Sequence, residues 1–542
     1  MTLLTKVRTC LYNNFFLTLA TNPIFAQIYI SVLLIAWILG IEGSQFLARI
    51  AVCVIACTSI CFYFLNEKSL RTFDLQTLSS KLWVRIAVGS FLNIFVAFLF
   101  LTPILRTHLG LQGIDFAIFS QVVDSIARLG SPMTTLVRME DVNFFEHHFS
   151  PFLLLPGLLS KFGIPSYIVL SLIHGLVFTL SFVLFYLAQR TLNFSRTLSL
   201  AITVLLISNA TIRQSVFWGI HDETFAVAFF SLAYWAWFSS RFWIMILALI
   251  LAATTKETMA LVSACFLAIV LWEECFTKRR FFKQSLSKTQ LYFVQILTFC
   301  LFLYSFGYVF VQPYILGKNF DHFDKLANIK ELLNGPSIDG KLELLKFLLI
   351  PVAFIPFLIP QYWHFTLPAL SLLGMIIISK FDQMWSLMNY YGVIPSYILY
   401  FATVLVCYHN AKIKEFLKQP FVLVLLLSYN FSWSTERPMN PIRKLNSSNV
   451  LKSEQLSIIS DDATVISSAN PAIFLFRVKK LWRLYHANQS IPKEFDFVVL
   501  LKHEVFQPDS EMNEELKSLV NECYSDDRWV IYCNKHSSLK LQ

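Results

Sequence analysis

Long runs of apolar residues follow one another along most of the chain, with short polar segments between them. A hydrocarbon core about 30 Å thick needs roughly 20 apolar residues to be crossed by a helix. On that scale the sequence predicts about thirteen membrane-spanning helices, at approximately 24–43, 46–65, 84–104, 166–188, 197–217, 223–239, 242–256, 257–272, 290–312, 344–360, 363–379, 391–408 and 419–434. The apolar runs lack the single short, cleavable pattern of a secretory signal, so we expect the first to be a retained anchor.

Basic residues gather on one side of these spans. They precede the first span and follow the second, fourth, eighth and twelfth, as Lys6, Arg8, Lys68, Arg71, Lys81, Arg85, Arg190, Arg196, Lys278, Arg279, Arg280, Lys283, Lys288, Lys412, Lys414 and Lys418. The positive-inside rule makes that side cytoplasmic. The other side then receives the long segments 105–165 and 313–343 and the tail after 434, so we expect a cytoplasmic N-terminus and an extracytoplasmic C-terminus.

The tail becomes polar and punctuated from about residue 435. Short strands are predicted at 455–460, 463–468, 495–501 and 528–534, and an amphipathic helix at 510–525. We see no catalytic motif and no nucleotide-binding glycine pattern there. The predicted fold is an all-α polytopic transmembrane bundle over 1–434, followed by a small α/β soluble domain over 435–542.

Composition agrees with a membrane protein. Hydrophobic residues make up 56% of the chain and charged residues 14%, against roughly 25% charged in soluble domains, so a water-soluble fold is excluded. A net charge of +10 would suit a nucleic-acid partner, but the basic residues lie where the positive-inside rule puts them. We therefore expect membrane lipids and no nucleic acid as partners.

Two groups of cysteines invite a chemical interpretation. Cys53, Cys57 and Cys61 share one helix face, but no histidine or carboxylate joins them, which favours small packing groups over a metal site. Cys523 and Cys533 lie in the tail, where an oxidising compartment would permit a disulfide. The sequence alone leaves that pairing open.

The first candidate for chemistry is the segment GIDFAIFSQVVDSIARLG at 113–130. Its apolar residues recur at helical spacing, as Phe116, Phe119, Val123 and Ile126, which predicts a helix lying along the membrane surface. Asp115 falls at the N-terminal end of this helix. Its carboxylate is either a helix cap or a general base or metal ligand facing a cavity, and the two roles are compatible.

Two further polar clusters fall on the same predicted side. In NFFEHHFSPFLLLP, Glu146, His147 and His148 precede an apolar run, and WGIHDETFAVAF carries a second cluster, His221, Asp222 and Glu223. An acid at the start of a helix is favoured by the helix dipole, which is the structural interpretation of both. The functional one is a divalent metal ion bound by at most two of the first group, Glu146 and His147; beyond such an ion the sequence indicates no cofactor.

Lys256 and Glu257 interrupt the apolar stretch LAATTKETMALV. Charges near membrane depth are costly and usually face a cavity or each other, so these two residues either pair together or leave Lys256 to bind a phosphate. Arg213 and Arg138 are weaker candidates for the phosphate. Tyr391, in NYYGVIPSY, suits either a substrate site or an interfacial aromatic belt.

Taken in order, GIDFAIFSQ, EHHFSPFLLL, WGIHDETFA, TTKE and NYYGVIP resemble the DUF2079 family of uncharacterised bacterial and archaeal membrane proteins, over roughly residues 110–434. The ordered set is much more specific than any single piece. This chain has Ser120 where the family often has a second acid after the phenylalanine, which weighs against a mechanism that needs two carboxylates within that helix.

The family in turn resembles the GT-C glycosyltransferases, which include protein O-mannosyltransferases and lipid A aminoarabinose transferases. That resemblance implies a sugar donor linked to polyprenyl phosphate, an unknown extracytoplasmic acceptor, inversion at the anomeric carbon, and Asp115 at the catalytic acid position. Glu146 or His147 would orient Asp115 or hold a metal, Lys256 and Arg213 would neutralise the leaving phosphate, and His221, Glu223 and Tyr391 would line the pocket.

Two other classes of function remain open. Intramembrane charges and outer carboxylates also suit a transporter or flippase of a lipid-linked or polar substrate, although the chain shows no convincing internal repeat. A scaffold that displays the tail would explain the tail but not the acids. The family resemblance implies a bacterial plasma membrane as the location.

Overall fold

The computed structural model describes residues 114–137, 141–218, 220–276, 286–308, 351–378 and 391–419, and parts of 422–430, 456–501 and 512–541. The expected spans at 24–43, 46–65 and 84–104 lie outside the described residues, as do Arg138, the segment 313–343 and the cysteines near residue 57.

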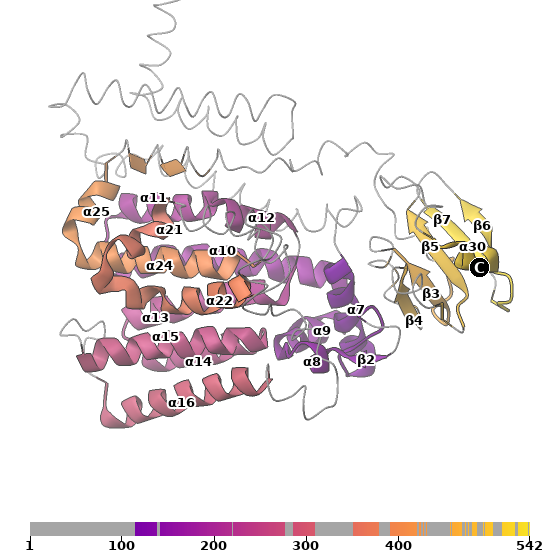
Figure 1. Ribbon diagram of the computed structural model, residues 1–542, viewed down its shortest axis with the longest axis horizontal. Coiled ribbons are helices and arrows are strands. Elements are labelled where there is room, and N and C mark those ends of the chain that lie inside the picture. The colour runs from indigo at the N-terminus through magenta and orange to yellow at the C-terminus, as the bar shows by residue number, and fades with distance from the viewer. Residues whose placement is uncertain are drawn as a thin grey trace, which may run out of the picture.

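Long helices run side by side through the body of the molecule (Figure 1). They are α10 (Ser166–Thr191), α13 (Asp222–Phe238), α14 (Phe242–Ala253), α15 (Glu257–Phe276), α16 (Lys288–Phe306), α22 (Leu367–Ile378) and α24 (Val393–His409). Aromatic side chains fill the interior. Tyr234 stacks on Phe401 with ring centroids 4.1 Å apart, and Phe266 meets Tyr234 edge-on at 4.6 Å. The helical bundle predicted from the apolar runs is therefore confirmed over its described part.

Three of the described helices, α10, α15 and α16, are long and apolar enough to cross a membrane, and α24 with the short α25 (Ala411–Leu417) would make a fourth if that bent pair is one span. The count of about thirteen is not confirmed. A stripe of half-exposed apolar side chains runs along α10, at Leu172, Leu176, Leu180, Val183 and Leu187. In a bundle surrounded by lipid, such a stripe is the surface that contacts the acyl chains.

The span expected at 197–217 is two helices, α11 (Arg196–Ser208) and α12 (Ala210–Trp218). The break falls at Asn209, whose backbone is not helical (φ −57°, ψ 133°). Its side-chain oxygen accepts hydrogen bonds from the amide of Thr211, at 3.0 Å, and from the Thr211 hydroxyl. Asn209 thus caps a new helix where the hydropathy pattern alone indicated an unbroken one.

A smaller group of elements lies at one end of the bundle. It comprises α7 (Ile114–Leu129), β1 (Met133–Thr134), β2 (Val142–Asn143), α8 (Phe144–His147), η1 (Pro151–Leu153) and α9 (Leu154–Ser160). The helix predicted at 113–130 is present as α7, but its apolar face is covered by protein and does not lie on the membrane surface. Phe116, Val122 and Ile126 are all buried.

The close fit of α7 against α9 depends on Gly157. A Cβ atom at Gly157 would overlap the side chain of Ile126. The neighbouring α9 leaves Leu155 and Leu158 exposed. An exposed apolar surface at this end of the bundle therefore belongs to α9, and α7 is packed between α9 and the interior.

The described part of the tail is a five-stranded sheet in the order β4-β3-β5-β7-β6. Its elements are β3 (Thr464–Ser467), β4 (Lys480–Arg483), β5 (Phe497–Leu501), α30 (Glu514–Leu519), β6 (Val520–Ser525) and β7 (Trp529–Asn534). β3 is parallel to β4 and β5, and β7 is antiparallel to β5 and β6. Figure 1 shows this domain beside α7, and the apolar residues on one face of its sheet join α7 in a single hydrophobic cluster.

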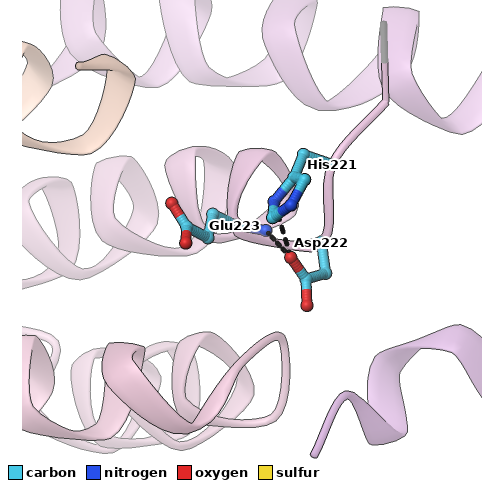
Figure 2. A group of neighbouring side chains, drawn as sticks. All are labelled: His221, Asp222 and Glu223. Atoms are coloured by element: carbon cyan, nitrogen blue, oxygen red, sulfur yellow. Dashed lines mark hydrogen bonds and ion pairs between the residues drawn. The ribbon is translucent and has the colours of Figure 1, made fainter. Parts of the chain in front are cut away.

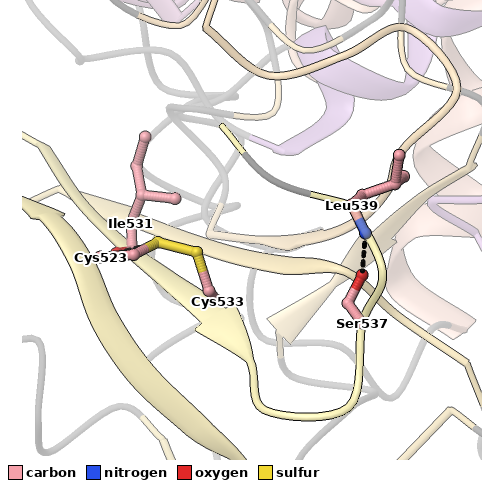
Figure 3. The surroundings of a disulfide bond; sticks show 5 residues. All are labelled: Cys523, Ile531, Cys533, Ser537 and Leu539. Carbon is pink, nitrogen blue, oxygen red and sulfur yellow. Dashed lines mark hydrogen bonds between the residues drawn. A yellow bond between two sulfur atoms is a disulfide. The ribbon is translucent and has the colours of Figure 1, made fainter. Parts of the chain in front are cut away.

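The strands predicted at 463–468, 495–501 and 528–534 are confirmed as β3, β5 and β7. The strand predicted at 455–460 is wrong, because the described residues there form a turn and a bend at Ile458 and Ile459. The helix predicted at 510–525 ends at Leu519, since Val520–Ser525 pairs with β7 instead. Cys523 and Cys533 form a disulfide between β6 and β7, with Cα atoms 5.7 Å apart (Figure 3).

Candidate functional site

Charged side chains are concentrated where α13 and α15 begin. His221, Asp222 and Glu223 open α13, while Lys256 and Glu257 open α15. Because α14 runs back between these two helices, both starts lie at the same end of the bundle. All five residues are at most 7% exposed, so each charge needs partners within the protein.

Asp222 is the centre of this cluster (Figure 2). Its Oδ1 lies 2.7 Å from Nδ1 of His221 and accepts a hydrogen bond of 2.9 Å from the backbone N–H of Glu223. The same oxygen is 3.7 Å from Nζ of Lys256. The hydroxyl of Ser150 donates to Oδ2 at 2.8 Å. A fully buried carboxylate is thus paired on both of its oxygens.

Lys256 forms its direct ion pair with Glu223 of α13. It lies between α14 and α15, outside both helices. Burial by itself would lower its pKa, but the attraction of Asp222, Glu223 and Glu257 outweighs burial and raises the pKa above its ordinary value. Lys256 is therefore a charged ammonium group that links the starts of the two helices.

The segment 148–152 forms hydrogen bonds with residues at the starts of both α13 and α15. Nδ1 of His148 lies 3.2 Å from Oε1 of Glu257, and the backbone N–H of Phe149 donates to Oε2 at 3.2 Å. Phe152 donates its N–H to the carbonyl of Thr254 at 3.1 Å. Together with Ser150, these contacts give the HFSPF part of the sequence a defined role, which is to close the cluster from the loop side.

Aromatic rings connect the cluster to α7 and to α24. The ring of Phe119, on α7, meets His221 edge-on at 5.5 Å, and the ring of Tyr391 lies 6.3 Å from that of His221. Asp115 is in the first turn of α7, partly buried, four residues before Phe119. Residues at i and i+4 lie on one helix face, about 6 Å apart at Cβ. Asp115 is therefore on the face of α7 that meets the cluster.

The structure thus brings together four of the predicted site residues, His221, Glu223, Lys256 and Tyr391. Their roles in a reaction stay predictions. Four further residues complete the site: Ser150, His148, Asp222 and Glu257. None of them was predicted as a site residue from the sequence. His148, Asp222 and Glu257 are each next in sequence to a predicted site residue. That position was the signal that could have identified them. Ser150 gave no signal of its own.

The other predicted site residues are less closely tied to the cluster. Glu146 lies on the short α8 with a partly exposed side chain, and the side chain of His147 is outside the described part of the structure. Their role as metal ligands stays a prediction. Arg213, buried in α12, donates to the carbonyl of Asn430 at 2.8 Å, and its contact with a phosphate also stays a prediction.

One group in the described part of the chain has the composition of a metal site. His221, Asp222 and Glu223 each offer a ligand atom, and these atoms lie within 4.8 Å of one another. The cluster holds three carboxyl groups, on Asp222, Glu223 and Glu257, and one amino group, on Lys256. Such a cluster fits a cation bound to oxygen and imidazole ligands, in competition with the ammonium group of Lys256.

Comparison with known proteins gives one family match. The family described as "Predicted membrane protein (DUF2079)" matches residues 106–538, and so includes most of the C-terminal domain. No curated protein matches the chain.

Two of the solved structures that match the chain are ArnT and AftD. ArnT from Cupriavidus metallidurans bound to undecaprenyl phosphate has a TM-score of 0.49 and 11% identity, covering 84% of this chain and 99% of that one. The arabinofuranosyltransferase AftD from Mycobacteria has a TM-score of 0.44 and 11% identity, covering 83% and 40%. Scores below 0.5 do not establish a shared fold.

Proposed function

This chain belongs to the DUF2079 family of predicted membrane proteins, and from that premise we propose that it is a membrane glycosyltransferase. It transfers a sugar, with inversion, from a polyprenyl-phosphate donor to an acceptor on the extracytoplasmic face. The observation that carries the proposal is the buried cluster around Asp222 and Lys256, set at one end of the bundle against the helix that bears Asp115.

In the proposed reaction the bond between the anomeric carbon and the phosphate oxygen breaks. A bond from the acceptor oxygen to that carbon forms on the opposite face. Asp115 takes the proton of the acceptor hydroxyl as general base, and the lipid phosphate leaves with the bonding electrons. Glu146 or His147 orients Asp115 from α8.

The leaving phosphate gains negative charge as its bond breaks, so positive charge must be available near it. A divalent ion held by His221, Asp222 and Glu223 would supply that charge, either in place of or beside a pair of ligands from Glu146 and His147. Lys256 adds a fixed cation to the same place, and Arg213 is a further candidate.

The orientation of the site is part of the proposal. The disulfide between Cys523 and Cys533 is the kind of bond that persists in an oxidising compartment. It supports an extracytoplasmic C-terminal domain and, with it, a plasma-membrane protein whose N-terminus is cytoplasmic. The cluster then lies at the end of the bundle nearer the side on which the acceptor is found.

The proposal can be tested by native mass spectrometry of the detergent-purified protein with undecaprenyl phosphate, the ligand of the ArnT structure, as the probe. We expect the wild type and Asp115→Asn to retain the lipid, Lys256→Met to lose most of it, and the exposed control Lys418→Ala to behave as wild type. Sugar transfer, once a donor is found, should be lost in Asp115→Asn. A lipid that binds wild type and Lys256→Met equally would remove the assigned role of Lys256.

A transporter is the second candidate, because the buried pair of Lys256 and Glu223 is the kind of charge pair that transporters use along a substrate path. The two functions differ in a proteoliposome assay. Movement of a lipid-linked sugar across the bilayer without a new glycosidic bond would favour the transporter, and a new bond on one face would favour the transferase.

A further inference from the structure

The C-terminal domain is connected to α7 by polar contacts as well as by apolar packing. Thr135, in the loop after β1, lies between the two. Its hydroxyl donates to the backbone carbonyl of Leu481 in β4 and accepts a 3.1 Å hydrogen bond from the N–H of the same residue. It also accepts a 3.0 Å hydrogen bond from Nε2 of Gln121 in α7.

These contacts use the full hydrogen-bonding capacity of a hydroxyl group, which is one donor and two acceptor positions. Thr135 is only 4% exposed, so water does not compete for them. β4 is an edge strand with β3 on one side only, and Thr135 supplies partners on its other side. The loop therefore pairs with Leu481 on the open side of β4, and the Thr135 hydroxyl links the sheet to α7.

Gln121 completes the connection from the side of α7. Its Oε1 accepts hydrogen bonds from the hydroxyl of Thr134, at 2.7 Å, and from the backbone N–H of Thr135, at 3.0 Å. Two residues earlier, Phe119 meets the ring of His221. A continuous series of contacts thus runs from β4 through Thr135, Gln121 and α7 to the candidate site.

We propose that the C-terminal domain sets the position of α7 against the His221 cluster, with Thr135 and Gln121 as positioning residues. The domain then contributes to the site without a catalytic residue of its own, which agrees with the lack of a catalytic motif in the tail. The functional meaning of this inference rests on the proposed transferase, since α7 carries Asp115, but the coupling itself is a structural claim that can be tested separately.

The test compares Thr135→Val, which keeps the shape but lacks the hydroxyl, with Thr135→Ser, which keeps the hydroxyl. Hydrogen exchange of the full chain in nanodiscs is followed by mass spectrometry for peptides of α7, β4 and α15. In Thr135→Val we expect α7 and β4 to exchange at least about fivefold faster, the scale of a lost buried hydrogen-bond network. α15 and the whole of Thr135→Ser should match wild type.

A second measurement reads the site directly. Diethyl pyrocarbonate modifies exposed histidines, and His221 is 6% exposed. Displacement of α7 should remove Phe119 from His221 and speed its modification at least severalfold in Thr135→Val, with Thr135→Ser as the rescue. A domain that only docks, without positioning α7, would lose protection in β4 while α7 and His221 stay as in wild type, and this result would overturn the inference.

Faster hydrogen exchange in α15 would show that Thr135→Val does not fold correctly. In that case Gln121→Leu is used as the test variant. It breaks the link to α7 but leaves Thr135 on Leu481, so we expect loosened α7 with β4 still protected. Unchanged α7 in Gln121→Leu would equally overturn the inference. Neither outcome depends on lipid retention, so failure of the transferase proposal remains distinguishable from failure of this one.

Discussion

Each buried charged side chain at the starts of α13 and α15 has specific partners within the protein. Glu223 pairs with Lys256, Asp222 with His221 and Ser150, and Glu257 with His148 and Phe149. Removing water from a charge costs several kcal/mol, and only well-placed partners offset this cost. The loss of one of these side chains should therefore destabilise this end of the bundle more than the loss of an apolar side chain of similar size.

Glu223→Gln should destabilise the protein, because it removes the carboxylate in direct contact with the Lys256 ammonium and leaves Asp222, at 3.7 Å, as a more distant partner. Breaking one partner of a buried pair costs about 3 kcal/mol, so we expect a thermal unfolding midpoint several degrees lower in detergent. The control is Glu415→Gln, which breaks the exposed pair with Lys418 and should cost about 1 kcal/mol or less. Equal shifts in the two variants would contradict a buried, charged Lys256.

The sequence singled out segments that the structure brings together, but it did not show which residues pair within them. Lys256 and Glu257 are neighbours along the chain, yet Lys256 pairs with Glu223, while Glu257 binds the loop at His148, 109 residues earlier. Ser150 and Asp222 are 72 residues apart. Such partners are set by how α13, α14 and the loop 148–152 pack, and hydropathy carries no information about that packing.

At the scale of helices and strands, apolar runs predicted the long helices well and their interruptions poorly. α10, α15 and α24 begin and end within a few residues of the predicted spans. The break at Asn209 was missed because a side-chain cap, and not hydropathy, determines where α12 begins. The strand at Val520–Ser525 was missed because its pairing with β7 determines its structure. β4 was missed as well, since four residues with a lysine and an arginine at their ends give a weak strand signal.

The contact between α7 and α9 gives a prediction at this scale. Gly157→Ala places a Cβ against Cβ and Cγ2 of Ile126, which are near the backbone and have no room to swing away. We expect a loss of about 1–3 kcal/mol, as for other overpacked sites. Gly374→Ala in α22, where a Cβ would meet no atom within 4 Å, should be neutral or stabilising by up to about 1 kcal/mol. Thermal unfolding of the two variants checks this, and a stable Gly157→Ala would show that α7 and α9 can separate.

At the scale of the whole molecule, the bundle and the C-terminal domain meet at the elements that flank the site. The domain buries Val465, Leu481 and Trp529 in one cluster with Phe116 and Ile126 of α7. The tail was expected to be a separate soluble domain, and its strands justify that description. What hydropathy did not show is that the amphipathic face of α7 is apolar because it packs against this domain and α9.

The disulfide gives a prediction for the whole molecule. Alkylation without reductant should leave Cys523 and Cys533 unmodified and modify the exposed Cys275. Cys523→Ser should lower the stability of the domain by about 2–3 kcal/mol, the chain-entropy estimate for a bridge over 10 residues, while Cys275→Ser should leave it unchanged. Alkylation of both tail cysteines in protein taken directly from membranes would place the domain in a reducing compartment.

The two edges of the sheet have a further consequence. An unpaired strand edge can pair with strands of other molecules and so promote aggregation. Here the Thr135 hydroxyl occupies the backbone groups of Leu481 on the β4 edge, and the β6 edge is irregular between Glu522 and Tyr524. The same loop that ties the domain to the bundle therefore also makes the β4 edge a poorer template for the sheet of a neighbouring copy.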